Sequence, residues 1–394
     1  MIDKVSAEQC VLCGSCRNAC PVDAISFSNR YLDFVYPKID AERCIKCNRC
    51  ERACPVLKDR KSGDTAAVQP TACAARNLND EIRRFSTSGG LFHVLASHVL
   101  TGGGCVCGAV FDERFRVRHI VSDSPDDVRR MMGSKYAQSD MGMCYREIKE
   151  QLAAGRQVLF SGCPCQVAGL RAYLDREYPN LLLVELICHG IPSAEMLGSY
   201  IAMREKQYGA KLRKLEFRNK DEGWHRSAVR MEFENGKVYR TPVLEDEYMN
   251  GFLNSYMLKP SCYDCRFRNF TTGFDIALGD FWGIETMPSW EDDNRGTSAV
   301  LVNTEKGRAF LEQLPLERKP CSLDEVIQFN KSLVCSSNPN PQRAAFYAWA
   351  ESNGYASAIR HFLRYPASQR IKKKVRYRLR CLRNLLQGRE KPFY

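Results

Sequence analysis

Short apolar runs alternate with longer apolar or amphipathic segments through the middle of the chain. The runs at 157–161 and 181–187 are continuous, brief and bounded by polar residues or glycine, which predicts buried strands. The segment 91–100 has no period of two and suits a helix, which Gly102-Gly103-Gly104 would end. By the same criteria we expect further strands at 24–28, 34–39, 105–112, 117–121, 214–218, 227–234, 238–241 and 275–280. Further helices are expected at 126–132, 142–154, 166–177 and 247–256, and 298–313 is interpreted as a strand followed by a helix.

This mixture predicts an α+β or mixed α/β fold. Two of the strands run directly into a cysteine-containing loop and then a helix. The strand at 157–161 leads into Gly162-Cys163-Pro164-Cys165-Gln166, and the strand at 181–187 leads into Cys188-His189-Gly190, with Ser193 as the cap of the next helix. Because open α/β sheets bind ligands at the carboxyl ends of their strands, these cysteines mark a candidate site.

A cysteine pattern occurs twice near the N-terminus and predicts a separate iron–sulfur module at residues 1–60. Each copy reads C-x2-C-x2-C-x3-C-P, the spacing of bacterial ferredoxins that hold two [4Fe–4S] clusters. We assign Cys10, Cys13, Cys16 and Cys54 to one cluster, and Cys44, Cys47, Cys50 and Cys20 to the other, since the fourth ligand comes from the opposite motif. Structural zinc and disulfides are the alternatives. Zinc sites favour two pairs of ligands, four in all, rather than eight cysteines with this repeated spacing.

Length and composition narrow the class of protein. The 394 residues suffice for two or three domains with ample core. The 20 cysteines are not expected to form a secreted disulfide scaffold, because the chain starts without an apolar signal segment and iron–sulfur ligands must stay reduced. No apolar run approaches a membrane span, so we expect a cytoplasmic protein. The net charge of +12 leaves nucleic acid, an anionic membrane face or acidic electron carriers as partners.

Much of this charge is concentrated in the basic, helix-permissive tail from residue 370 onward. Such a tail is either a solvated helix or a segment attracted to anionic lipid or an acidic partner, at the inner membrane face for example. No nucleic-acid-binding module accompanies it, so nucleic acid is not expected. Earlier in the chain, Ser86-Thr-Ser-Gly89-Gly90 enters a helix, and free N–H groups at such a turn suit a phosphate.

At this point the chain resembles the β-subunit family of coenzyme F420 hydrogenases and dehydrogenases, joined to the two-cluster ferredoxin module. The resemblance covers roughly residues 1–335. Each shared motif is short, and their number and order carry the resemblance: Ser86–Gly90, Gly133-Ser-Lys-Tyr136 with Gln138-Ser139, Gly162–Gln166, Cys188-His-Gly190 with Pro192-Ser193, Phe217-Arg218, Cys262-x2-Cys265 and Gly279-Asp-Phe-Trp-Gly283.

The resemblance implies a bound FAD. It places the pyrophosphate at the backbone of Ser88, Gly89 and Gly90, and the isoalloxazine or ribityl group beside Ser134, Lys135, Tyr136 and Gln138. For Lys135 and Tyr136 the alternative is ordinary surface and core packing.

The resemblance also implies a third [4Fe–4S] cluster beside the flavin, on Cys165, Cys188, Cys262 and Cys265. The alternative is that these four are buried, inert cysteines. Cys163 stands where the family commonly has a hydroxyl residue such as threonine. It either replaces Cys165 as a cluster ligand, or is a reactive thiol, or only packs in place of the threonine. Cys105 and Cys107 share one face of a strand and are interpreted as core.

His189, next to a proposed ligand, is the candidate catalytic residue, as a proton relay to the flavin or substrate; the alternative is a hydrogen bond that shapes the loop. Asp280 and Trp282 are candidates to line the flavin cavity, with core packing the alternative for Trp282.

We therefore expect an FAD- and iron–sulfur-dependent oxidoreductase that passes electrons between a ferredoxin or other redox carrier and a two-electron substrate, for example in polysaccharide biosynthesis. The alternatives are a coenzyme F420 oxidoreductase, with coenzyme F420 as substrate, and a non-catalytic electron-transfer subunit with a redox partner. The expected domains are a ferredoxin-type module (1–60), a linker (61–72), the N-terminal-like (73–155) and C-terminal-like (156–335) β-subunit domains, and a helical basic tail (336–394).

Overall fold

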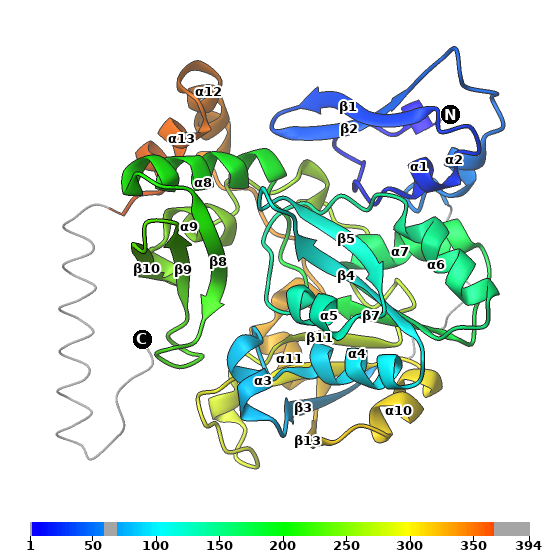
Figure 1. The fold of residues 1–394 in the computed structure, drawn as a ribbon, viewed down its shortest axis with the longest axis vertical. Helices are drawn as coiled ribbons and strands as arrows, with labels where there is room; N and C mark the ends of the chain where they lie inside the picture. The colour runs from blue at the N-terminus through cyan, green and yellow to red at the C-terminus, as the bar shows by residue number, and fades with distance from the viewer. Residues whose placement is uncertain (1, 59–68, 366–394) are drawn as a thin grey trace.

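The computed structural model describes residues 2–58 and 69–365 of the chain (Figure 1). Within these ranges the strands form sheets of two, three and eight strands. The strands are β1 (Ile25–Tyr31), β2 (Phe34–Ile39), β3 (Thr71–Asn77), β4 (Cys105–Phe111), β5 (Val117–Ser122), β6 (Val158–Gly162), β7 (Leu181–Leu186), β8 (Leu212–Asn219), β9 (Ala228–Phe233), β10 (Val238–Pro242), β11 (Ile276–Asp280), β12 (Ser298–Val302) and β13 (Leu316–Cys321). The α-helices are α1 (Ser15–Ala19), α2 (Arg49–Arg52), α3 (Asp80–Phe85), α4 (Leu91–Thr101), α5 (Pro125–Met131), α6 (Cys144–Ala153), α7 (Pro164–Leu174), α8 (Ala194–Tyr208), α9 (Glu247–Leu253), α10 (Glu305–Glu312), α11 (Leu323–Phe329), α12 (Arg343–Asn353) and α13 (Tyr355–Ala358).

The eight-stranded sheet is the centre of the molecule. Its order is β13-β3-β12-β11-β7-β6-β4-β5, and the inner strands β11, β7, β6 and β4 run parallel while the outer ones pair antiparallel. The strands β3, β4 and β5 come before residue 156 in the chain and flank the block β12-β11-β7-β6, which comes after it, so both parts of the chain build one sheet. The parallel strands β6 and β7 are buried along nearly their whole length, as expected when helices cover both faces.

Separate hydrophobic cores lie on the two faces of this sheet. On one face α4, α5 and α10 contribute Leu95, Val128 and Phe310. On the other face α6, α7 and α11 cover a core that includes Tyr145 and Leu170. The sheet therefore sits between two helical layers, which leaves its strand ends as the open edges of the structure.

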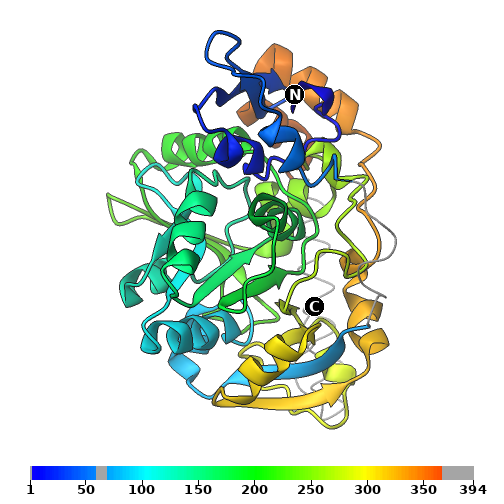
Figure 2. The ribbon, with the colours of Figure 1, turned by 90° about the vertical axis from the view of Figure 1, so that its right-hand side faces the viewer.

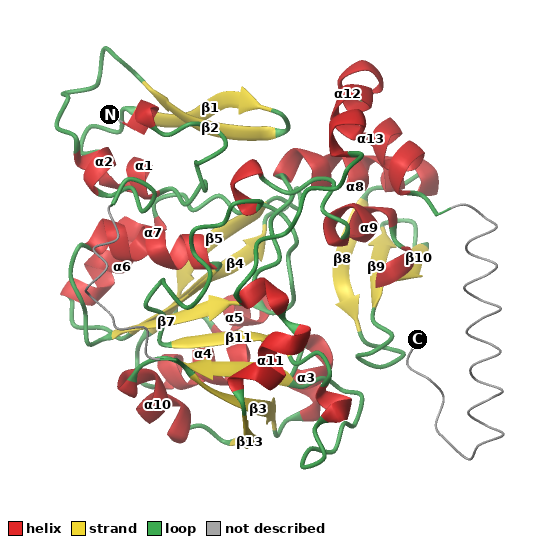
Figure 3. Cartoon of the chain, turned by 180° about the vertical axis from the view of Figure 1, so that it is seen from behind, coloured by secondary structure: helices red, strands yellow, loops and turns green. Residues whose placement is uncertain are grey.

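A three-stranded sheet of order β10-β9-β8 stands beside the large sheet (Figure 3). Its apolar side packs on α8, α9 and α12 in a third core, with the aromatic residues Tyr200, Phe217 and Tyr248 among the most buried. This unit supplies one wall of the site described below.

The N-terminal module consists of the β1–β2 hairpin with α1 and α2, and it rests on α6 and α7 at the end of the molecule away from β3 and β13 (Figures 1 and 2). The contact is specific. Arg146 of α6 donates to the carbonyl oxygen of Asn18 at 2.7 Å and pairs with Asp23 at 2.8 Å. The Asn18 amide donates to the carbonyl oxygen of Gly142 at 3.0 Å. The module is thus docked by hydrogen bonds that a loosely tethered domain would lack.

Most of the expected elements are confirmed, with shifts of up to three residues at their ends. Ser193 caps α8 by accepting from the N–H of Met196, and Gly102 follows the end of α4. The helix expected to reach 177 ends at Leu174, because Asp175 adopts a left-handed conformation (φ 55°). The edge strand β13 was not expected.

Two expectations concern residues outside the described ranges. The expected linker at 61–72 falls largely on 59–68, and β3 already begins at Thr71. The basic segment from 370 onward also lies outside the described residues. Among residues 2–58 and 69–365, no helix is both long and apolar enough to cross a membrane.

Candidate redox site

A cavity of about 290 Å³ lies toward the carboxyl ends of β4, β6, β7 and β11. This is the edge at which parallel sheets bind ligands, because loops diverge there and leave a crevice. Most of the residues proposed for the flavin or the chemistry reach this one cavity, although they come from distant segments: Ser88, Gly90, Ser134, Lys135, Tyr136, Gln138 and His189. Apolar side chains such as Leu91, Ile187 and Phe252 complete the lining, a composition typical of cofactor sites.

The turn before α4 is held to the sheet rather than being free. Ser88 Oγ donates to the carbonyl oxygen of Thr297 at 2.5 Å, and the N–H of Gly89 donates to Ser298 Oγ at 3.0 Å. A Cβ on Gly89 would meet the carbonyl oxygen of Ala75 at 2.6 Å, so only glycine fits this approach to β3. Ser88 and Gly90 line the cavity, whereas Gly89 faces the sheet and its N–H is already used.

The segment 133–138 forms the facing wall. The N–H of Ser134 donates to Thr87 Oγ1 at 2.8 Å, and the hydroxyl groups of the two residues also lie 2.8 Å apart. Lys135 Nζ donates to the carbonyl oxygens of Met131, Met132 and Gly133 at 3.0–3.2 Å and thereby satisfies the end of α5. Burial, together with Arg130, lowers the pKa of Lys135 to about 7. The ring of Tyr136 packs against Phe217 and Phe252.

His189 is held by hydroxyl groups on both sides of its ring. Its Nε2 lies 3.4 Å from Ser255 Oγ and its Nδ1 lies 3.3 Å from Ser337 Oγ. Burial lowers its pKa, which favours the neutral ring. His189 lines the cavity. A neutral imidazole between two hydroxyl groups suits both alternatives, a residue that shapes the loop and a residue that moves a proton.

Two further polar residues line this region without having been chosen as site residues from the sequence. His119 is fully buried, and burial lowers its pKa to about 4. Its Nε2 lies 3.1 Å from the carbonyl oxygen of Ser161 and must therefore donate, so Nδ1 accepts from Ser139 at 2.7 Å. A single histidine on a strand gives no sequence signal, which is why it was missed.

Arg218 belongs to a quoted motif but was not assigned a role. It pairs with Asp280 at 3.0 Å, and Asp280 also accepts from Trp224 Nε1 at 3.2 Å. The Nη2 atom of Arg218 is buried and has no hydrogen-bond partner among the described residues. Asp280 lines the cavity, whereas Trp282 stacks on Trp224 and is 37% exposed outside it.

A groove of about 600 Å³ adjoins the cavity and shares the wall formed by Thr87, Ser134 and Lys135. Basic side chains outnumber acidic ones around it: Arg84, Arg129, Arg130, Lys135, Arg213, Lys214, Arg218 and Lys220, against Glu81, Glu216 and Asp221. Burial lowers the pKa of Lys220 to about 7, and its Nζ donates to the carbonyl oxygens of Ser88 and Arg295. The groove and the orphaned Arg218 nitrogen suit an anionic group.

The four dispersed cysteines meet on the side of the cavity that faces the N-terminal module. Burial raises the pKa of the Cys165 thiol to about 12, Lys259 opposes this, and the nearby thiols of Cys188, Cys265 and Cys262 raise it further. Cys188 lines the cavity, so this group of four, the dispersed quartet, borders the proposed flavin position. A set of four thiols is the ligand set of one cubane.

Cys163 caps α7 next to this quartet. Its N–H donates to Gln166 Oε1 at 2.9 Å, and its thiol contacts Cys188. A hydroxyl residue caps a helix in the same way, which explains how a cysteine substitutes for one here.

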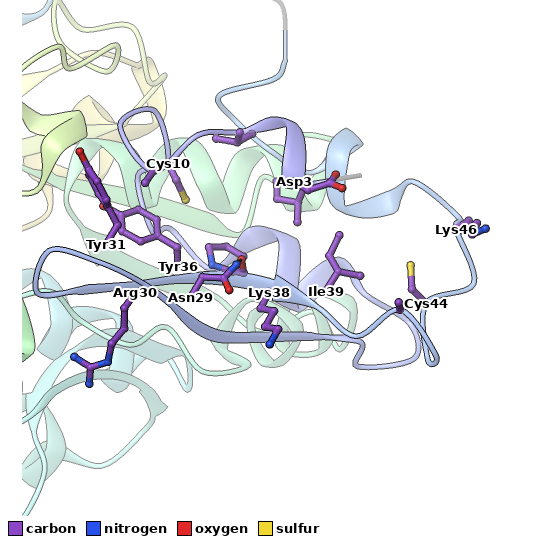
Figure 4. A pocket seen from close by; sticks show the side chains of 15 residues that line it. Asp3, Cys10, Asn29, Arg30, Tyr31, Tyr36, Lys38, Ile39, Cys44 and Lys46 are labelled. Atoms are coloured by element: carbon purple, nitrogen blue, oxygen red, sulfur yellow. Dashed lines mark hydrogen bonds between the residues drawn. The ribbon is translucent and has the colours of Figure 1, made fainter.

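The two proposed groups of cysteines in the N-terminal module differ in how many of their members are buried, three in one and one in the other. Cys10, Cys13, Cys16 and Cys54, the inner quartet, line one small cavity together. Burial raises the pKa of Cys16, and the thiols of Cys10 and Cys54 raise it further. Cys20, Cys44, Cys47 and Cys50 form the outer quartet; Cys20 is buried and the other three are partly exposed. Cys10 and Cys44 also line a surface cavity of about 550 Å³ beneath the β1–β2 hairpin (Figure 4).

No group of three His, Cys, Asp or Glu side chains in the described part of the chain is close enough to hold a single metal ion. Thiolates around one zinc ion would lie about 3.8 Å apart, given Zn–S bonds of about 2.3 Å in a tetrahedron. A cubane separates its four thiolates more widely. Each quartet offers the four thiols that one cubane requires. The lining of the cavity fits a flavin, and the unpartnered Arg218 nitrogen of the adjoining groove fits an anionic group beside it.

Comparison with known proteins gives independent support at the level of domains. Residues 9–57 match the 4Fe–4S dicluster domain, and residues 155–320 match the C terminus of the coenzyme F420 hydrogenase/dehydrogenase β subunit. None of the curated proteins matches the chain. Among solved structures, a chain of the F420-reducing [NiFe] hydrogenase complex from Methanosarcina barkeri aligns with a TM-score of 0.46 and 18% identity, over 84% of this chain and 99% of that one. The chain therefore combines a segment that matches a 4Fe–4S dicluster domain with a segment that matches the C terminus of the coenzyme F420 hydrogenase/dehydrogenase β subunit.

Proposed function

We propose that this protein is an iron–sulfur flavoprotein oxidoreductase that carries electrons between an external redox carrier and a two-electron substrate. The carrying observation is the order of sites along the molecule. Three of the four outer-quartet cysteines are partly exposed, three of the four inner-quartet cysteines are buried, and Cys188 of the dispersed quartet lines the cavity that gathers the flavin-motif residues. Such an order is expected of a path from solvent to substrate.

In this proposal the cavity would hold FAD and the three quartets would hold [4Fe–4S] clusters. A flavin exchanges electron pairs with organic substrates and single electrons with clusters, which is why the two groups occur together. The protein's part is to hold and orient them. Tyr136 and Phe252 form an aromatic wall, Gln138 presents its amide, and Lys135 lines the shared edge of cavity and groove.

His189 would move the proton that accompanies a hydride at the substrate. Its neutral ring accepts a proton at one nitrogen while the other interacts with a serine hydroxyl, and Ser255 and Ser337 orient it for this role. The basic groove beside the cavity favours a substrate with an anionic group.

The test is iron and flavin stoichiometry on protein purified without oxygen. About twelve irons and one FAD per chain are expected for three cubanes and one flavin. Cys188→Ser should lower the iron content to about eight, whereas Cys163→Ser, the neighbour that caps α7, should leave it at about twelve. Eight irons in the unaltered protein, or an unchanged count in Cys188→Ser, would contradict the third cluster. Absence of FAD would contradict the flavin.

A coenzyme F420 oxidoreductase is the second candidate, favoured by the family match at 155–320 and by the basic groove. Anaerobic titration separates the two. If reduced coenzyme F420 bleaches the flavin, this second function holds. If only reduced ferredoxin does so, the substrate is another metabolite. Reduction by neither would leave the non-catalytic electron-transfer subunit.

We also propose that the basic residues from 370 onward bring the protein to an anionic membrane face, where sugar- or lipid-linked substrates of polysaccharide biosynthesis would be met. Their positive charge supports this. Deletion of 370–394 should abolish sedimentation with vesicles that contain anionic lipid, and unchanged sedimentation would remove the idea.

A further inference from the structure

Lys259 is a fully buried lysine at the junction of the N-terminal module and the rest of the chain. Its exposed fraction is 1%, against 8% for the buried Lys220. Its Nζ donates to the carbonyl oxygen of Val11 at 2.5 Å, within the first cysteine loop of the module. It also donates to Gln138 Oε1 at 3.0 Å, and Gln138 lines the cavity. One ammonium group therefore contacts both the module and the cavity wall.

The charged groups that act on this ammonium most strongly are thiols rather than carboxylates. They are Cys165 and Cys262 of the dispersed quartet, Cys10 of the inner quartet, and Cys163. Burial lowers the pKa of Lys259, and these thiols outweigh it, so the pKa is raised overall. A buried ammonium costs several kcal/mol unless negative charge compensates it. At this position the compensation comes from the sulfur atoms of two quartets, the inner quartet of the N-terminal module and the dispersed quartet of the rest of the chain.

We propose that Lys259 is a shared counter-ion between the inner and the dispersed [4Fe–4S] clusters, and that it raises the reduction potential of both. The proposal rests on the proposed function, because it requires clusters on both quartets. The step it serves moves one electron from the inner to the dispersed cluster, or back. The donor is oxidised, the acceptor is reduced, and no bond or proton changes. A carrier of the ferredoxin class supplies or accepts the electron at the outer quartet.

The physical reason is electrostatic. Reduction adds one negative charge to a cluster, and a fixed positive charge nearby in a water-poor interior favours the reduced form. Because Lys259 acts on ligands of both quartets, its charge favours the electron on either side of the junction. Its hydrogen bond to Val11 at the same time fixes the distance between the two domains.

Arg268 offers a matched comparison. It is also buried, and it donates to the carbonyl oxygen of Cys188 at 3.1 Å and to that of His189 at 3.3 Å. The pKa of Cys188 is raised by its hydrogen bond with Cys163 and by burial, and the pKa of Cys265 is raised by burial; the charge of Arg268 opposes both shifts. Its charge therefore acts on the dispersed quartet, whereas the charge of Lys259 acts on both quartets.

The experiment is an anaerobic redox titration of the full-length protein, followed by electron paramagnetic resonance, with iron content measured on the same samples. Lys259→Gln keeps a donor for Val11 but removes the charge, and Lys259→Arg keeps the charge. In Lys259→Gln we expect the reduction equilibrium of both clusters to fall at least tenfold, which is 59 mV for a one-electron couple. Lys259→Arg should retain the potentials, and Arg268→Gln should lower only that of the dispersed cluster.

The outcomes separate this inference from the proposed function. Unchanged potentials in Lys259→Gln with full iron content would overturn the inference and leave the function intact. A shift in only one cluster would overturn the shared role. Fewer than about twelve irons in the unaltered protein would overturn both. If Lys259→Gln loses iron, Lys259→Met is measured next. Loss of iron in Lys259→Met, with full iron in Lys259→Arg, would show that the positive charge is needed to hold the clusters.

Discussion

At the scale of single residues, the close approach of Gly169 to Cys13 joins helix α7 to the N-terminal module. A Cβ on Gly169 would lie 2.9 Å from Cys13 Sγ and 2.8 Å from Cys13 Cβ. These distances leave no room for a methyl group beside a proposed cluster ligand. The glycine is thus required by a contact between domains, not by the conformation of its own helix.

We expect Gly169→Ala to displace Cys13, to lower the iron content by up to one cluster and to cost about 1–3 kcal/mol of folding free energy. Gly198→Ala in α8 is the matched control, because nothing lies within 4 Å of its Cβ position. The control should keep its iron and gain up to about 1 kcal/mol, since alanine restricts the unfolded chain. Iron analysis and anaerobic thermal melting measure both. Equal iron content in the two variants would contradict the close contact.

Glu185 gives a residue-scale prediction about pH. It is 5% exposed in β7, and burial raises its pKa to about 8 although a hydrogen bond from Thr272 lowers it. The folded state therefore holds a proton that the unfolded state releases near pH 4.5. Stability is fully present below that pH and is lost as pH rises toward 8, by at most about 1.4 kcal/mol per unit.

Melting temperatures at pH 5, 6.5 and 8 test this. Glu185→Gln should weaken the decline between pH 5 and 8, because the amide has no proton to lose. Glu113→Gln, at an exposed turn between β4 and β5, should keep the decline of the unaltered protein. If the slope of Glu185→Gln equals that of Glu113→Gln, the carboxyl is not the group that titrates.

At the scale of elements, the β1–β2 hairpin is held by one buried carboxylate. Asp33, at the hairpin turn, accepts from Ser193 Oγ at 2.5 Å and from Tyr347 Oη at 2.8 Å. Ser193 caps α8 and Tyr347 lies in α12, so three elements meet at this group. Burial raises its pKa to about 6 against these two hydrogen bonds.

Asp33→Ala should leave two buried hydroxyl groups without their acceptor and cost about 1–3 kcal/mol. Arg30→Ala in the same hairpin removes only an exposed ion pair with Glu195 and should cost no more than about 1 kcal/mol. Hydrogen exchange of the β1–β2 amides measures the local effect. We expect faster exchange in Asp33→Ala alone. Equal rates in the two variants would show that the Asp33 carboxylate does not hold the hairpin.

The elements also show what the sequence could and could not predict. Cysteine spacing predicted the two ferredoxin motifs. The period and length of the apolar runs predicted helix α4 and the strand–loop–helix units of Cys163 and Cys188. All of these signals are local in the sequence. The edge strand β13 was missed, since its sequence Leu-Glu-Arg-Lys-Pro-Cys is polar and takes its conformation from pairing with β3. Strand order depends on long-range pairing, so the meeting of Cys165 with Cys262 and Cys265 followed from the family resemblance and not from spacing. His119 and Lys259 gave no signal, because each is a single polar residue whose role depends on its tertiary neighbours.

At the scale of the whole molecule, the three quartets differ in their access to solvent. Cys44, Cys47 and Cys50 of the outer quartet are partly exposed, whereas Cys13 and Cys16 of the inner quartet are 7% and 6% exposed. Oxidants attack accessible sulfur first. On the proposed function we therefore expect the outer position to be both the entry for electrons and the first position to be damaged by oxidants.

Graded exposure to a soluble oxidant should remove iron in phases, with about four irons lost first. The spectrum of the outer cluster should disappear in this phase while the other two persist. Electron paramagnetic resonance and iron analysis on the same samples measure this. Simultaneous loss of all clusters would contradict the ordered exposure.

The docked N-terminal module has a consequence for kinetics. It is part of the same chain, so its contact with α6 and α7 forms at an effective concentration that dilution does not change, in the millimolar range for short linkers. A separate ferredoxin would have to find this surface anew in every turnover. In the fused chain a visiting carrier needs a single encounter at the outer surface, and transfer inward is a first-order process whose rate is independent of protein concentration.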